Sequence, residues 1–161
     1  AFQDWPGVFD RMAKVIREAM VNRAALAPPR SLVAESPKVE VQVGELFDKI
    51  SILEIKVKRI ADTKRLENVH RELKELCLVR DKLVPASTTL DAFVVQLDEV
   101  NLAIWDNEER MRAWAKAEDF GADYIAGARS IAKNNDRRAA IKRSINDLLG
   151  SRLIEEKSYQ T

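Results

Sequence analysis

Residues 44–60 of this chain place ionic side chains beside a clean apolar stripe, and those side chains could do chemistry. Asp48, Lys49, Lys56 and Arg59 crowd this stretch. Carboxylates and bases on one helix could bind a metal–phosphate group. Such a set is more often a solvated face, stabilised by pairs of opposite charge four residues apart. The solvated face is therefore the favoured interpretation of these residues alone.

A second polar set interrupts an apolar seam in the middle of the chain. Asn101 and Glu108 lie seven residues apart on this seam, with Trp105 between them on the same side. A carboxylate that enters a core is costly unless it is paired. The pattern predicts either a polar pocket inside a helical bundle or a polar pair that sets the register of packing, and it favours the register pair.

The third polar set lies in a basic stretch near the end of the chain. Residues 129–143 hold six bases and one acid, whereas residues 90–120 hold eight acids and three bases. The basic stretch either faces the acidic one or forms a site for phosphate. We predict that the three polar sets converge on one region, where acids of the middle stretch pair with bases of the last. The candidate ligand-binding residues are Asp48, Lys49, Lys56, Arg59, Asn101, Trp105, Glu108, Arg138, Lys142 and Asn146; no catalytic residue or metal ligand is predicted.

Apolar spacings of three and four residues predict the helices that must position these side chains. The first two, at 46–60 and 63–83, are joined by a short break at Asp62-Thr63 and should form an antiparallel hairpin. The third, 90–119, is the longest, should be capped near Ser87 and should close at Phe120-Gly121. Asn134-Asn135-Asp136 predicts a break between a fourth helix, 122–133, and a fifth that ends at Gly150. The fold class is all-α, a bundle of four to five helices.

The region before the bundle has a different composition. Residues 8–25 show a helical apolar face, and residues 27–37 hold three prolines and two serines. Residues 38–43 alternate polar and apolar side chains, which predicts one short strand. We therefore divide the chain into an N-terminal helix with its linker, 1–37, and a bundle domain, 38–161.

The overall composition limits the classes of protein to which this chain can belong. The 161 residues carry a net charge of +1, with 33% charged and 46% hydrophobic residues, which is a globular balance. A single cysteine, Cys77, cannot form an intrachain disulfide and indicates a reducing compartment, so we expect a cytoplasmic protein. No apolar run approaches the roughly 20 residues of a membrane helix. The chain begins at Ala1 without a methionine, which is typical of a piece of a longer protein.

Several motifs together resemble one family, an uncharacterised helical domain of bacteria and their phages. They include Gly44-Glu45-Leu46 through Arg59-Ile60, the run from Asn135-Asp136 to Asn146, and Glu155-Glu156-Lys157-Ser158-Tyr159. The resemblance covers about residues 43–159, and it implies a helical domain without assigned chemistry. This chain departs from the family pattern at Asn107, where the family tends to an apolar residue, and at Ala132, where an aromatic residue is usual.

The favoured function is a binding or interaction domain that docks a partner protein or an anionic, phosphate-bearing ligand and needs no cofactor. We expect a homodimer, because the strand-like segment at 38–43 lacks a mate within the chain and could pair with a second copy. The alternative is that this segment remains a plain linker. The alternative function is a small Mg²⁺-dependent hydrolase or transferase acting on a nucleotide or sugar phosphate, for which Glu72 and Glu75 would supply the first of two carboxylate pairs. Nucleic acid is not an expected partner, because the basic stretch lacks interleaved aromatics.

Overall fold

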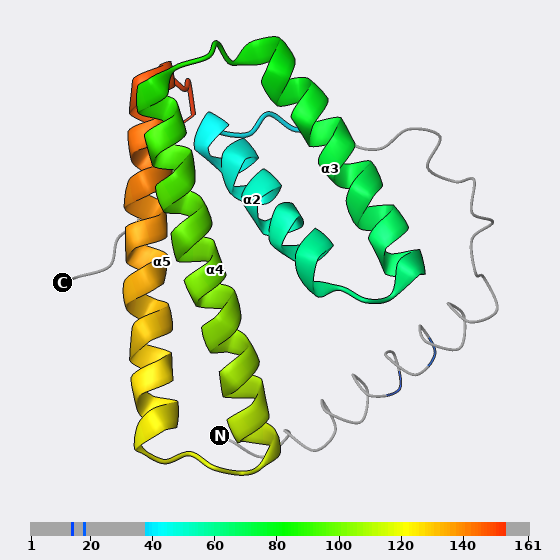
Figure 1. The fold of residues 1–161 in the computed structure, drawn as a ribbon, viewed down its shortest axis with the longest axis vertical. Helices are drawn as coiled ribbons and strands as arrows, with labels where there is room; N and C mark the ends of the chain where they lie inside the picture. The colour runs from blue at the N-terminus through cyan, green and yellow to red at the C-terminus, as the bar shows by residue number, and fades with distance from the viewer. Residues whose placement is uncertain (1–13, 15–17, 19–37, 154–161) are drawn as a thin grey trace, which may run out of the picture. The chain divides into compact units, whose positions relative to one another are not determined.

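The computed structural model describes Lys14, Glu18 and residues 38–153, and its architecture is all-α (Figure 1). The described helices are α2 (Val43–Arg59), α3 (Thr63–Leu83), α4 (Thr88–Lys116) and α5 (Ala122–Leu149). Helices make up 82% of the described residues, so the predicted fold class is confirmed. The chain divides into two compact units, Ala1–Val39 and Glu40–Thr161, and all four helices belong to the second. Lys14 and Glu18 are helical, and the rest of the predicted N-terminal helix and linker lies outside the described residues.

Helices α2 and α3 form the predicted antiparallel hairpin (Figure 1). Asp62 is the N-cap of α3, and its side chain accepts a hydrogen bond from the backbone N–H of Arg65 at 2.9 Å. Among the described helices, α3 packs only against α2. Val69 is accordingly the one buried residue of α3. The hairpin is therefore held to the bundle through α2 alone.

Helices α4 and α5 form the long antiparallel pair against which α2 packs. Ser87 caps α4 as predicted, because its side chain accepts from the backbone N–H of Leu90. The 29 residues of α4 span about 43 Å at 1.5 Å per residue. The core lies where α2, α4 and α5 meet and contains Phe47, Leu90, Leu97, Val100, Ile104, Ile141 and Ile145.

The predicted break at Asn134-Asn135-Asp136 is wrong, because α5 runs through it as one helix of 28 residues. Asn and Asp cost only about half a kcal/mol each in a helix interior, and no proline or glycine interrupts this stretch. Asn134 donates to Ser130 Oγ at 3.3 Å, one turn back along the same helix. Continuous packing against α4 outweighs the weak helix propensity of three residues, so the described bundle has four helices, within the predicted four to five.

The possible strand does not form within the chain: residues 38–42 are neither helix nor strand, and the part of the chain that is described contains no strand. The backbone of Gln42 is extended, but Val39 and Val41 are exposed. An extended segment becomes a strand only when a second segment pairs with its backbone. Gly44 lies in the first turn of α2.

The turn between α4 and α5 differs from the prediction at its glycine. Helix α4 ends at Lys116, and Glu118 adopts the left-handed conformation with φ of 55°. Gly121 has φ of −70° and is the N-cap of α5 instead of the terminator of α4. At the far end of α5, Gly150 has the predicted capping role with φ of 62°.

Candidate functional site

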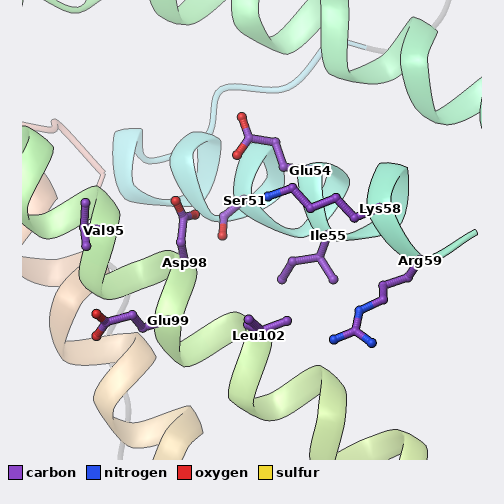
Figure 2. Close-up of a pocket in the computed structure, with 9 residues that line it drawn as sticks. All are labelled: Ser51, Glu54, Ile55, Lys58, Arg59, Val95, Asp98, Glu99 and Leu102. Atoms are coloured by element: carbon purple, nitrogen blue, oxygen red, sulfur yellow. The ribbon is translucent and has the colours of Figure 1, made fainter.

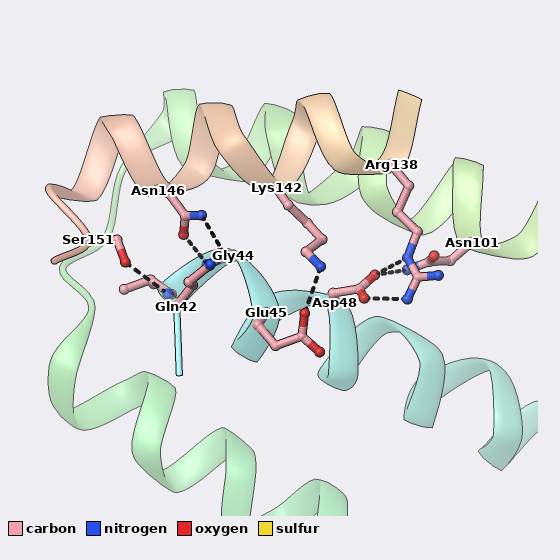
Figure 3. A network of polar contacts seen from close by, with 10 residues as sticks. Gln42, Gly44, Glu45, Asp48, Asn101, Arg138, Lys142, Asn146 and Ser151 are labelled. Atoms are coloured by element: carbon pink, nitrogen blue, oxygen red, sulfur yellow. Dashed lines mark hydrogen bonds and ion pairs between the residues drawn. The ribbon is translucent and has the colours of Figure 1, made fainter. Parts of the chain in front are cut away.

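A buried carboxylate joins three helices at the centre of the bundle (Figure 3). Asp48 on α2 is 1% exposed. Arg138 on α5 donates from Nε to Asp48 Oδ1 at 2.8 Å, and its Nη2 contacts Asp48 Oδ2. Asn101 on α4 donates from Nδ2 to Asp48 Oδ1 at 3.0 Å and to Ser51 Oγ at 3.1 Å. The bidentate arginine and the amide together compensate the cost of burying the charge.

The N-terminus of α2 is capped by residues that lie more than a hundred positions later in the chain. Gln42 provides no side-chain cap to α2. Instead, Asn146 Oδ1 accepts from the backbone N–H of Gly44 at 2.7 Å, and Ser151 Oγ accepts from that of Val43 at 3.4 Å. These acceptors satisfy two of the N–H groups that a helix start leaves without an intrahelical partner. The start of α2 therefore depends on the end of α5.

Gly44 allows α2 and α5 to approach each other at this point. A Cβ atom at position 44 would lie 2.5 Å from the backbone oxygen of Lys142 and 3.1 Å from Asn146 Oδ1. Nearby, Lys142 Nζ donates to Glu45 Oε2 at 2.6 Å. The Lys142 side chain is 12% exposed and that of Glu45 is 36% exposed, so this pair is only partly removed from water. The close approach at Gly44 and the Lys142–Glu45 ion pair both hold α2 against α5, and they lie within one turn of α2.

The structure brings some of the predicted site residues together and leaves others apart. Asp48, Asn101, Arg138, Lys142 and Asn146 converge along the α2–α5 contact (Figure 3). The acids that meet the bases of α5 there are on α2, so the expected pairing of these bases with acids of the middle helix is wrong at the centre. Such a pairing occurs at the surface, where Arg137 lies 3.6 Å from Glu99.

The remaining predicted residues lie away from this network. Lys49 is exposed and Lys56 is half-buried. Arg59 pairs with Asp106 on α4 at 2.8 Å. Trp105 donates to Glu109 at 2.9 Å, and Glu108 accepts from Arg112 at 2.8 Å. Both of these contacts stay within α4. Glu108 lies at the edge of the packed face and not on the seam as predicted.

Four contributors were missing from the candidate set predicted from the sequence: Gln42, Glu45, Ser51 and Ser151. Gln42 joins the network because its Oε1 accepts from Asn146 Nδ2 at 3.1 Å. Ser51 and Glu45 lie three residues from Asp48 on either side, so both share its face of α2. Their spacing of three residues from Asp48 could therefore have identified both from the sequence. Asn107 is buried and donates to Ser130 Oγ on α5 at 3.0 Å. A polar contact therefore joins α4 to α5 at this position.

A cleft of about 270 Å³ opens between α2 and α4 (Figure 2). Val95 and Leu102 on α4 and Ile55 on α2 supply its apolar surface. Ser51 reaches the cleft from the network, since its hydroxyl also accepts from Asn101. The charged residues that line it are Glu54, Lys58 and Arg59 from α2, and Asp98 and Glu99 from α4.

The chemistry available to these two features differs. Asp48 is enclosed and accepts hydrogen bonds from two side chains, so it cannot reach a substrate as a base or a nucleophile. The cleft is open and combines an apolar surface with charged walls, which suits binding. Within residues 38–153 and the two described residues before them, no group of three His, Cys, Asp or Glu side chains could hold a metal ion. Of the helices described, none is long and apolar enough to cross a membrane.

One protein-family model matches residues 37–161, a range that includes all four helices, the network and the cleft. It is described as a family of unknown function, DUF6165. No match was found among curated proteins. None was found among solved structures.

Proposed function

The chain belongs to this family of unknown function, and from its own residues we propose that it is a protein-interaction domain. The α2–α4 cleft is the docking site, and its ligand is a helical segment of a partner protein. The segment places one or two apolar side chains in the cleft and polar side chains over its charged walls. This is the helix-in-groove mode of recognition, in which a few apolar anchors give affinity and the surrounding charges give specificity.

The observation that carries the proposal is apolar surface displayed around a concave site. Val95 is 57% exposed and Leu102 is 40% exposed, and both line the cleft. They lie seven residues apart on α4, so they share one face of the helix. Burying apolar surface is favourable by about 25 cal/mol per Å². A partner that covers both side chains thus gains hydrophobic free energy without rearranging the bundle.

The charges of the cleft favour a side chain of a protein over a phosphate-bearing molecule. A phosphate would meet three carboxylates there, those of Glu54, Asp98 and Glu99. The bases proposed for phosphate already have acidic partners, since Arg138 binds Asp48 and Lys142 binds Glu45. Glu72 and Glu75, on which the Mg²⁺-dependent alternative rests, are exposed on α3 away from both features.

The proposal is tested with a displayed library of random helical peptides selected against the full chain. Selected peptides should bind with an affinity that falls about tenfold or more in Val95→Glu and Leu102→Glu, because a carboxylate then replaces an apolar anchor. The matched control is Leu78→Glu on α3, since Leu78 is 57% exposed like Val95 but does not line the cleft. Circular dichroism confirms that the three variants remain folded.

Two results would contradict the proposal. One is that selected peptides bind wild type, the cleft variants and the α3 control with the same affinity. The other is that inorganic phosphate or a nucleotide raises the melting temperature of the wild type and that Lys58→Glu abolishes the effect, which would support an anionic ligand instead.

A further inference from the structure

We infer that the helical segment that docks in the α2–α4 cleft carries a lysine or arginine between two apolar side chains, and that Asp98 and Glu54 select this base. The inference rests on the proposed function and names the chemistry of its partner. It makes both acids specificity-determining residues of the docking site.

Helix α4 presents an acid between the two apolar residues that it contributes to the cleft. Asp98 lies three residues after Val95 and four residues before Leu102, and all three line the cleft (Figure 2). Residues at these spacings share one face of a helix. The α4 wall is therefore apolar at both ends and acidic between them. A helix that lies along this wall complements it with a base between two apolar residues.

Contacts within the chain balance two of the five charges that line the cleft. Arg59 pairs with Asp106 at 2.8 Å, and Glu99 lies 3.6 Å from Arg137. The other three charges make no hydrogen bond or close ion pair among the residues that the structure describes. They belong to Glu54, Lys58 and Asp98.

The guanidinium of Arg80 does not neutralise Glu54. Arg80 is paired with Asp81, to which it donates at 2.8 Å. This hydrogen bond is the chief reason that the pKa of Arg80 is raised, and Glu54 makes the smallest contribution to the same shift. The three charges left in the cleft are therefore two carboxylates and one ammonium group.

A docked helix must remove these charges from water. Asp98 and Glu54 are already half-buried, whereas Lys58 is exposed. Lys58 follows Glu54 by four residues on α2, so its ammonium group can neutralise one carboxylate. The other carboxylate would be covered without a cation, which is costly. A base on the partner supplies this cation, whereas a neutral or acidic segment leaves the carboxylate unpaired.

Peptides selected against the full chain from the random helical library test the inference. They should be enriched in lysine or arginine three or four residues from an apolar residue. Asp98→Lys should weaken their binding about tenfold or more, because a like charge then faces the base of the peptide. A peptide whose base is replaced by glutamate should bind Asp98→Lys about tenfold more tightly than it binds wild type. The control, Glu72→Lys, reverses an exposed acid of α3 that does not line the cleft and should change neither affinity.

A neutral double variant separates the specific contact from the overall charge. Wild type should bind a selected peptide about tenfold more tightly than the same peptide with glutamine in place of its base. Glu54→Gln combined with Asp98→Asn removes both carboxylates with little change of shape, so this variant should bind the two peptides equally. Circular dichroism confirms that each variant remains folded.

The outcomes separate this inference from the proposed function. Selection of acidic or uncharged peptides overturns the inference, and so does equal weakening by Asp98→Lys and Glu72→Lys. If Val95→Glu and Leu102→Glu still weaken binding in either case, the docking site stands and only the chemistry of its partner is refuted. Peptides that ignore all of the cleft variants refute the docking site and, with it, the selection of a base.

Discussion

Replacing Gly44 with alanine tests how closely α2 and α5 depend on each other. The added Cβ would lie 2.5 Å from the backbone oxygen of Lys142, whereas carbon–oxygen contacts normally lie at about 3.3–3.6 Å. One helix must therefore move by about 1 Å. Because the obstructing atom belongs to the backbone of a helix, it cannot rotate away as a side chain could.

The change in the free energy of unfolding combines two costs and one gain. Overpacking a close contact costs about 1–3 kcal/mol. The same movement stretches the buried hydrogen bond from Gly44 N–H to Asn146 Oδ1, now 2.7 Å, and an unsatisfied buried donor costs about 1–3 kcal/mol. Alanine returns about 1 kcal/mol through its better helix propensity. The free energy of unfolding should fall by about 3 kcal/mol, which lowers the melting temperature by about 6–12 °C for a chain of this size.

Urea denaturation followed by far-ultraviolet circular dichroism measures this change, and Gly127→Ala is the matched control. Gly127 is also a buried helical glycine, but a Cβ there meets side chains and not backbone, the Sδ atom of Met111 at 2.9 Å and the Cζ3 atom of Trp114 at 3.2 Å. A methionine side chain is flexible and can move aside. Gly127→Ala should therefore change stability by less than about 1 kcal/mol. Equal stability of the two variants would refute the reasoning about the α2–α5 contact.

Three further changes have defined outcomes. Arg138→Met should lower the free energy of unfolding by about 3 kcal/mol, because it leaves the carboxylate of Asp48 buried without its cation; adding Asp48→Asn should recover part of the loss in urea denaturation, and no recovery would mean that charge is not the cause. Glu118→Gly should raise the free energy of unfolding by about 1 kcal/mol, because a backbone φ of 55° is strained for glutamate and not for glycine. An unchanged midpoint of urea denaturation would contradict this. The Arg152 guanidinium lowers the pKa of Glu40 below its ordinary value of 4.5, so their pair stabilises the fold above that pH and stops doing so as the pH falls through the lowered pKa. Thermal melts of Glu40→Gln should therefore show a small deficit against wild type at neutral pH that disappears in acid, and a deficit that persists in acid would argue against the linkage.

The sequence by itself determined the helices whose signals are local. The apolar spacings of α2, α3 and α4 and the caps at Asp62, Ser87 and Gly150 depend on residues within a few positions of one another. The convergence of Asp48, Asn101 and Arg138 was also predictable, because each lies on or beside an apolar seam and would be costly to bury alone.

Only the tertiary structure decided which groups satisfy one another. Packing against α4 keeps α5 helical through the predicted break, because the long contact outweighs the low helix propensity of three residues. The angle at which α2 crosses α5 assigned Arg138 and Lys142 to acids of α2 instead of acids of α4. The same placement opened the cleft beside Val95 and Leu102. Periodicity tells which face of a helix is apolar, but the partner that covers each face depends on how the helices pack in three dimensions.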